Sequence, residues 1–160
     1  MFDSIIDSIV TWLTNENINA VRRFPETKIE RAESVVAVSI KSAVMTASGA
    51  GNYLGIYEQG GVLCEVYGTR ADMTFALDIY TPSNSGTELF DAIADAIYSL
   101  PDGLKLKSFE CEDALFDEES GMFCMKSRLN CTAIMVRTEN TEHREFTGFV
   151  LRGELSGYEC

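Results

Sequence analysis

Hydrophobic and polar residues alternate most regularly between Arg70 and Thr81. Every second side chain in this segment is apolar, which is the period of two expected of a half-buried β-strand. The pattern therefore predicts one face in the core and one face toward water. The apolar positions are Ala71, Met73, Phe75, Leu77 and Ile79, and the polar positions are Arg70, Asp72, Thr74 and Asp78.

The alternating segment belongs to a longer strand prediction over residues 62–81. Strands usually have about 3–10 residues, so Gly68 is expected to mark a bulge or bend within it. Gly60 and Gly61 predict a tight reversal that joins this strand to a strand over 53–58. An earlier segment, residues 35–46, is rich in β-branched and small residues and predicts the first long strand.

Two segments have the spacing of amphipathic helices, residues 3–17 and 87–100. The apolar stripe of the first helix is Phe2, Ile5, Ile6, Ile9, Val10 and Leu13, with Asn15 and Asn17 at its end. Trp12 lies beside this stripe and is either a core anchor or an interface aromatic, and the core is favoured. In the second helix Thr87 is the expected cap, Leu89, Ile93, Ile97 and Leu100 form the stripe, and Pro101 and Gly103 stop it.

Residues 104–136 predict a wide two-stranded hairpin whose turn is Asp117–Gly121. One face of its outgoing strand is apolar, with Phe123, Met125, Leu129, Cys131, Ala133 and Met135, and the other carries Lys126, Arg128, Asn130 and Thr132. A C-terminal extension, residues 138–160, comprises a polar linker over Thr138–Arg144 and a final strand over Phe146–Leu155. The elements together predict a single α+β domain over 1–160. In it a mainly antiparallel sheet with a long hairpin packs against two helices on one face.

The charge balance limits the possible functions. The chain has 25 acidic and 13 basic residues among 160, a formal net charge of −12. Such a field repels phosphate, which argues against sequence-specific nucleic-acid binding. No apolar run approaches the roughly 20 residues of a membrane-spanning helix, and the first residues lack the positive region of a secretory signal. We therefore expect a soluble protein of the cytoplasm that binds no membrane.

Cysteine and histidine usage offers little chemistry. The five cysteines, Cys64, Cys111, Cys124, Cys131 and Cys160, are odd in number and never form a C-x-x-C pair, which is typical of a reduced protein. Cys111, Cys124 and Cys131 fall in predicted strands and are expected to be small buried hydrophobes. The only histidine, His143, lies in a polar loop. We expect no redox centre, no metal site and no cofactor.

Two segments could be read as ligand-binding sites, but a simpler structural interpretation is favoured for each. Gly49-Ala50-Gly51 leads into a strand instead of a helix, so a turn is favoured over a phosphate cradle. The acidic cluster Glu110, Glu112, Asp113, Asp117, Glu118 and Glu119 lacks the frame of a calcium loop, so a solvated turn is favoured.

A nucleophile such as Ser48 or Ser120 would need His143 as its base, and no G-x-S-x-G motif occurs. Spacing alone does not exclude chemistry by a pair of carboxylates. We expect no catalytic residues and no enzymatic activity.

The order of elements has a counterpart in a known family. A helix and long strands precede an alternating strand ending in DIYTP, the helix LFDAIADAIYSLP, and a hairpin containing GMFCMKSRLNCTAIM. From about Ser34 to Arg137 this order resembles bacteriophage tail terminator and tail completion proteins. The resemblance implies a subunit of a homo-oligomeric ring, a hexamer, that caps the tail tube and joins it to the head connector. It also implies a path from the host cytoplasm to the virion tail.

Two regions are candidates for contacts within such a ring. They are the loop Ser48, Gly49, Gly51, Asn52 and Tyr53, and the hairpin tip Asp117, Glu118, Glu119, Gly121 and Met122. Both regions fit ordinary surface loops equally well. Two alternatives to the terminator hypothesis stay open: another tail, neck or baseplate subunit, and a small monomeric binding module or enzyme.

Overall fold

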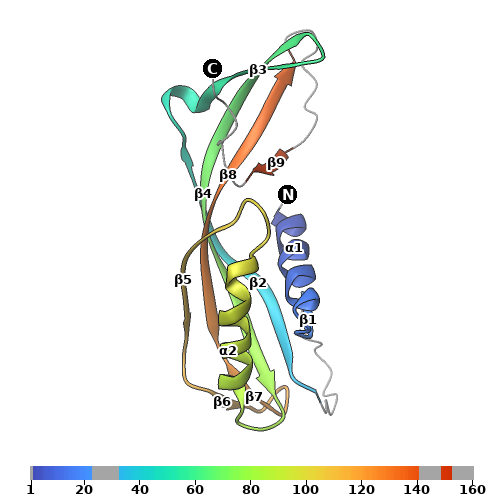
Figure 1. Ribbon diagram of the computed structural model, residues 1–160. Helices are drawn as coiled ribbons and strands as arrows, with labels where there is room; N and C mark the ends of the chain where they lie inside the picture. The colour runs from blue at the N-terminus through green and yellow to red at the C-terminus, as the bar shows by residue number, and fades with distance from the viewer. Residues whose placement is uncertain (1, 23–32, 141–148, 153–160) are drawn as a thin grey trace. The chain divides into compact units, whose positions relative to one another are not determined.

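A computed structural model describes residues 2–22, 33–140 and 149–152 of the chain (Figure 1). The described residues form two α-helices and one mainly antiparallel sheet of nine strands, which confirms the predicted α+β class. The helices are α1 (Phe2–Asn15) and α2 (Gly86–Ala96), with short 3-10 helices η1 (Ala50–Asn52) and η2 (Ile97–Ser99). The strands are β1 (Ala20–Val21), β2 (Val35–Ala47), β3 (Tyr53–Gln59), β4 (Val62–Thr81), β5 (Lys105–Cys111), β6 (Leu115–Asp117), β7 (Met122–Met125), β8 (Ser127–Asn140) and β9 (Phe149–Arg152).

The sheet is organised around β4. Strands run in the order β1-β2-β4-β7-β6, while β3 and β8 also pair with β4, and β8 pairs in addition with β5 and β9. β1 runs parallel to β2, and the pairs of β3 and β7 with β4, of β6 with β7 and of β8 with β9 are antiparallel. The two-residue strand β1 was absent from the sequence prediction, because two residues carry no periodic signal.

The residues gather into two compact units. The first contains the described residues up to Ser42 together with Thr74–Pro101 and Leu106–Cys131. The second contains Ala43–Met73, Asp102–Lys105 and the described residues from Thr132 onward. Strands β2, β4 and β8 contribute residues to both units, and the prediction of a single domain stays a prediction.

The predicted inner face of β4 is confirmed. Ala71, Met73, Phe75, Leu77 and Ile79 are at most 2% exposed, whereas the polar neighbours of Phe75 and Leu77, Thr74 and Asp78, keep partial exposure. In the first unit both helices cover this inner face of the strands (Figure 1). α1 buries Ile5, Ile9, Trp12 and Leu13 there, so Trp12 belongs to the core as predicted.

Asn17 lies where helix α1 ends. Asn17 adopts a left-handed conformation with φ of 62°, which asparagine tolerates better than most residues. The Asn17 N–H donates to the Thr14 carbonyl at 3.0 Å, and the Ile18 N–H donates to the Leu13 carbonyl at 2.9 Å. This pair of bonds is a Schellman motif and ends the helix two residues before the predicted boundary.

The boundaries of α2 correct the prediction. The Glu88 N–H donates to the Ser85 carbonyl, so the helix begins at Gly86 and Thr87 lies inside the first turn instead of capping it. A side chain at Gly86 would lie 3.3 Å from Cβ of Met125, which explains a glycine where the helix meets the sheet. The α-helix ends at Ala96, and η2 continues the chain to Ser99.

The predicted hairpin over 104–136 is more elaborate than two strands. β5 pairs with β8, but β6 and β7 form a second, smaller hairpin between them. The outgoing strand breaks at Lys126, whose carbonyl accepts a hydrogen bond from the Glu112 N–H at 2.8 Å. Of the predicted apolar face, Met125, Leu129, Cys131, Ala133 and Met135 are buried, whereas Phe123 is partly exposed.

Two other expectations need correction. Cys111 ends β5 and is exposed, so it is not a buried hydrophobe, whereas Cys124 and Cys131 are buried as predicted. Thr138–Asn140 belong to β8 and not to a linker. The final strand is present as β9, and the other residues of the predicted linker and final strand, His143 included, lie outside the described residues.

The bulge expected at Gly68 lies on the opposite strand. β4 is continuous from Val62 to Thr81, and the register with β3 shifts between Tyr53 and Gly55, so that Leu54 has no partner of its own. A Cβ atom on Gly68 would lie 2.3 Å from Cδ1 of Leu54. Gly68 therefore makes room for the side chain of the bulged residue.

Replacing Gly68 with alanine tests this packing. We expect Gly68→Ala to lower the free energy of unfolding by about 1–3 kcal/mol, because the added methyl group overpacks against Leu54. In a Leu54→Ala background the same substitution should cost clearly less, because the two nearest atoms belong to Leu54 and only Ile134 Cγ2, at 3.3 Å, remains. Urea unfolding of the four variants measures both values. Equal costs in the two backgrounds would contradict this explanation.

Candidate functional site

The face of the first unit's sheet that points away from the helices is polar and linked by hydrogen bonds. Phe109 of β5 stacks on Phe90 of α2 at 4.5 Å, so its neighbours Ser108 and Glu110 point to the opposite face. There Thr74 Oγ1 donates to Asn130 Oδ1 at 2.7 Å, and Asn130 Nδ2 donates to Ser108 Oγ at 2.8 Å. These bonds tie β4, β8 and β5 together on the face turned to solvent.

A hollow of about 370 Å³ lies at one end of this polar face. We call it the acidic hollow, because four of its nine lining residues are carboxylates and one is a lysine. The residues are Tyr80, Glu112, Asp113, Leu115, Phe116, Asp117, Glu119, Cys124 and Lys126. The β4–β7 register places Tyr80 directly opposite Cys124 at its base, and β6 supplies Leu115 and Phe116. Such a lining suits a cationic group on an apolar stem.

Tyr80 and Cys124 are hydrogen-bonded partners with suppressed acidity. Burial raises the pKa of the Tyr80 hydroxyl, and the nearby Cys124 raises it further. Burial also raises the pKa of the Cys124 thiol, although the hydrogen bond with Tyr80 opposes the shift. Both groups are therefore protonated at neutral pH. A protonated thiol is a poorer nucleophile than a thiolate.

Asp78 lies next to Tyr80 along the same face of β4. Burial raises the pKa of its carboxyl group, while the nearby charges of Lys41 and Lys126 lower it and Glu112 raises it again. Glu112 itself forms an ion pair with Arg128 at 2.7 Å. Charges of alternating sign thus lie near one another on this face of the strands.

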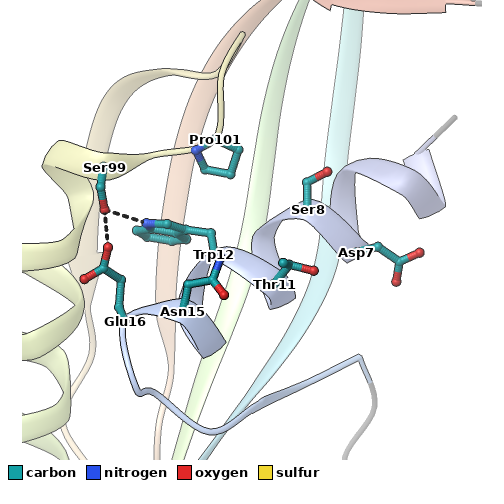
Figure 2. A pocket seen from close by; sticks show the side chains of 8 residues that line it. All are labelled: Asp7, Ser8, Thr11, Trp12, Asn15, Glu16, Ser99 and Pro101. Atoms are coloured by element: carbon teal, nitrogen blue, oxygen red, sulfur yellow. Dashed lines mark hydrogen bonds between the residues drawn. The ribbon is translucent and has the colours of Figure 1, made fainter.

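A second hollow, of about 440 Å³, lies between α1 and the chain that follows α2 (Figure 2). At its base Trp12 Nε1 donates to Ser99 Oγ at 3.1 Å, and Ser99 Oγ lies 2.6 Å from Glu16 Oε1 (Figure 2). The Ser99 hydroxyl thus connects the buried indole to an exposed carboxylate. Asp7, Ser8, Thr11, Asn15 and Pro101 complete the lining. These hydrogen bonds connect α1 to the chain after α2, and they explain the polar residues of this hollow without a ligand.

The two predicted contact regions belong to different units. In the loop, Gly49, Gly51 and Asn52 all have positive φ, the Ser48 N–H donates to Asn52 Oδ1 at 3.0 Å, and Tyr53 is 42% exposed. The loop is therefore an ordered turn with one exposed aromatic side chain, which agrees with the turn favoured from the sequence. Its role in contacts stays a prediction.

The hairpin tip is also an ordered turn. The Gly121 N–H donates to the Asp117 carbonyl at 2.8 Å, and the Ser120 N–H donates to Asp117 Oδ2 at 3.1 Å. Hydrogen bonds from Ser120 hold the pKa of the Asp117 carboxyl below its usual range. Glu118, Glu119 and Gly121 are exposed, but Met122 is only 3% exposed. Met122 is therefore buried in the single chain and offers no exposed contact surface, which corrects its place among the exposed tip residues.

Sequence reasoning assigned Asp117 and Glu119 to an exposed tip and missed the acidic hollow that they line. The polar position of Asp78 on β4 was predicted, but the pairing of Tyr80 with Cys124 depends on a long-range register. No group of three or more side chains suited to a metal ion occurs among the described residues.

Comparison with known protein families finds no match for this chain, and no curated protein matches it. In the described part of the chain, no helix has the length and apolar character needed to cross a membrane.

The substitution Asp78→Asn tests how the buried carboxylate of Asp78 changes stability with pH. Because the folded state raises the pKa of Asp78 above its ordinary value of 3.8, the folded protein holds this proton more tightly than the unfolded chain. The carboxylate therefore lowers stability above the folded pKa, and this penalty disappears as the pH falls through 3.8. We expect Asp78→Asn to be more stable than the native chain at pH 7, with the difference vanishing at acid pH.

Thermal unfolding between pH 3 and pH 7 measures this difference. Asp113→Asn is the matched control, because it removes the same charge from an exposed position in the acidic hollow. A difference between Asp78→Asn and the native chain that is independent of pH, or that equals the control, would rule out the burial of Asp78 as its cause.

Proposed function

We propose that this chain is a structural subunit of a bacteriophage or prophage tail, a terminator-like protein that forms a homo-oligomeric ring, caps the tail tube and joins it to the head connector. The observation that carries the proposal is the exposure of β2. All seven residues from Lys41 to Ala47 are exposed, although a strand that covers a core buries every second residue. This part of β2 therefore presents both faces to its surroundings, which favours a surface that a neighbouring subunit covers.

Apolar side chains strengthen this argument. Val44 is 58% exposed and Met45 is 45% exposed, and the second unit also exposes Ile56 and Leu63 by more than half. Monomeric proteins rarely leave large contiguous apolar patches in water, and such patches mark interaction sites. Identical subunits form a closed ring when one such surface binds a different surface of the next subunit and the rotation closes.

The described residues also support a structural role over a catalytic one. The acidic hollow lacks an activated nucleophile, because Cys124 is held protonated beside Tyr80.

The acidic charge of the chain suits the end of a tube through which DNA passes, because like charge prevents phosphate from docking. The element order from Ser34 to Arg137 resembles that of tail terminators, which supports this place in the tail over the neck and the baseplate.

Particles that lack this protein test the proposal. Because a terminator stops polymerisation of the tail tube, deletion should give overlong tubes without heads in negative-stain electron microscopy. Supplying the protein in trans should restore tails of uniform length. Tails of normal length joined to heads in the deletion would sink the terminator role. Baseplate loss with normal tube length would assign the chain to the other end of the tail.

A further inference from the structure

The charge on the described strands is distributed so that two surfaces complement each other. From Ser34 to Tyr57 the sequence contains no aspartate or glutamate, and Lys41 is its only charged residue. This segment contains the exposed stretch of β2, and we call its uncharged residues Ala43–Ala47 the acid-free strand. In a chain of net charge −12, the acid-free strand is a place where a second copy can approach without repulsion.

A second apolar surface lies on β6. Leu115 is 71% exposed and Phe116 is 57% exposed, and β6 pairs only with β7 among the described strands. We call Leu115 and Phe116 the β6 surface. It is flanked by Asp113, Asp117, Glu118 and Glu119, so its apolar side chains sit in an acidic border. An edge strand with exposed apolar side chains is a typical template for contact with another chain.

We infer that the acid-free strand of one copy packs against the β6 surface of the next copy. Both strands carry exposed apolar side chains, Val44 and Met45 on the two faces of one and Leu115 and Phe116 on the two faces of the other, so edge-to-edge pairing brings both faces into the contact. Two β6 surfaces would bring their acidic borders together, and like charge at an interface disfavours that pairing. Two acid-free strands gain no charge attraction, whereas the unlike pair places the acidic border near Lys41.

The inferred contact is heterologous, because it joins two different surfaces of the same chain. Each copy then has one surface of each kind free for a further neighbour, which is the property that ring closure requires. This inference rests on the proposed function and identifies the surfaces through which the subunits would meet. Neither surface uses the loop Ser48–Tyr53 or the tip Glu118–Gly121 as its centre, so it differs from the contacts expected from the sequence.

Two single substitutions separate the surfaces. Val44→Glu places a carboxylate on the acid-free strand, and Leu115→Glu places one on the β6 surface. Because a carboxylate buried without a partner is strongly unfavourable, each should weaken self-association at least about tenfold. Tyr98→Glu is the matched control, since Tyr98 is 95% exposed on η2, outside both surfaces. Sedimentation velocity over a concentration series measures association, and thermal unfolding checks that all three variants fold.

Mixing the two defective variants gives the sharpest result. Val44→Glu keeps its β6 surface and Leu115→Glu keeps its acid-free strand, so the mixture should form a dimer of one copy of each and nothing larger. A mixture that stays monomeric, or a variant that assembles as well as the native chain, would overturn the inferred contact. Failure of the native chain to assemble at any concentration would instead overturn the proposed function and the inference with it.

Discussion

The alternating burial of β4 is the constraint on which the rest of the structure depends. Five inward side chains, from Ala71 to Ile79, are almost fully buried, and a shift of the register by one residue would exchange them with polar neighbours. β2, β3, β7 and β8 all pair with this strand. The helices cover the inner face in the first unit, and the linked polar side chains Thr74, Ser108 and Asn130 lie on the outer face.

The position of the acidic hollow follows from the same alternation. Asp78 and Tyr80 occupy outward positions of β4, and the register of β7 brings Cys124 beside Tyr80. The break in the outgoing strand at Lys126 leaves room for β6, which adds Leu115 and Phe116 to the rim. A strand pattern that builds the core thus also determines which side chains line the surface that we assign to assembly.

Much of this fold could be predicted from the sequence because it depends on local periodicity. The inward face of β4, the apolar stripe of α1 and the glycine reversal at Gly60 and Gly61 are each visible over a few residues. Gly60 and Gly61 have φ values of 62° and 81°, the positive values that a tight hairpin turn requires.

What the sequence did not reveal depends on contacts between distant segments. Gly68 carries a signal for a bulge, but only its distance to Leu54 shows that the bulge lies on β3. The exposure of Cys111 and the burial of Met122 likewise depend on which strands pair and where β8 begins. Neither the exposed nor the buried part of β2 shows a regular alternation of apolar and polar residues, so periodicity could not distinguish the two.

The central claim is that surfaces exposed in the single chain become covered by identical subunits. Hydrogen–deuterium exchange, measured on dilute and on assembled protein, tests it most directly. The account predicts that backbone amides of Ala43–Ala47 and Leu115–Asp117 exchange more slowly in the assembled protein, while exchange within Phe75–Ile79 stays unchanged. Equal exchange of Ala43–Ala47 and Leu115–Asp117 in the two preparations would contradict it.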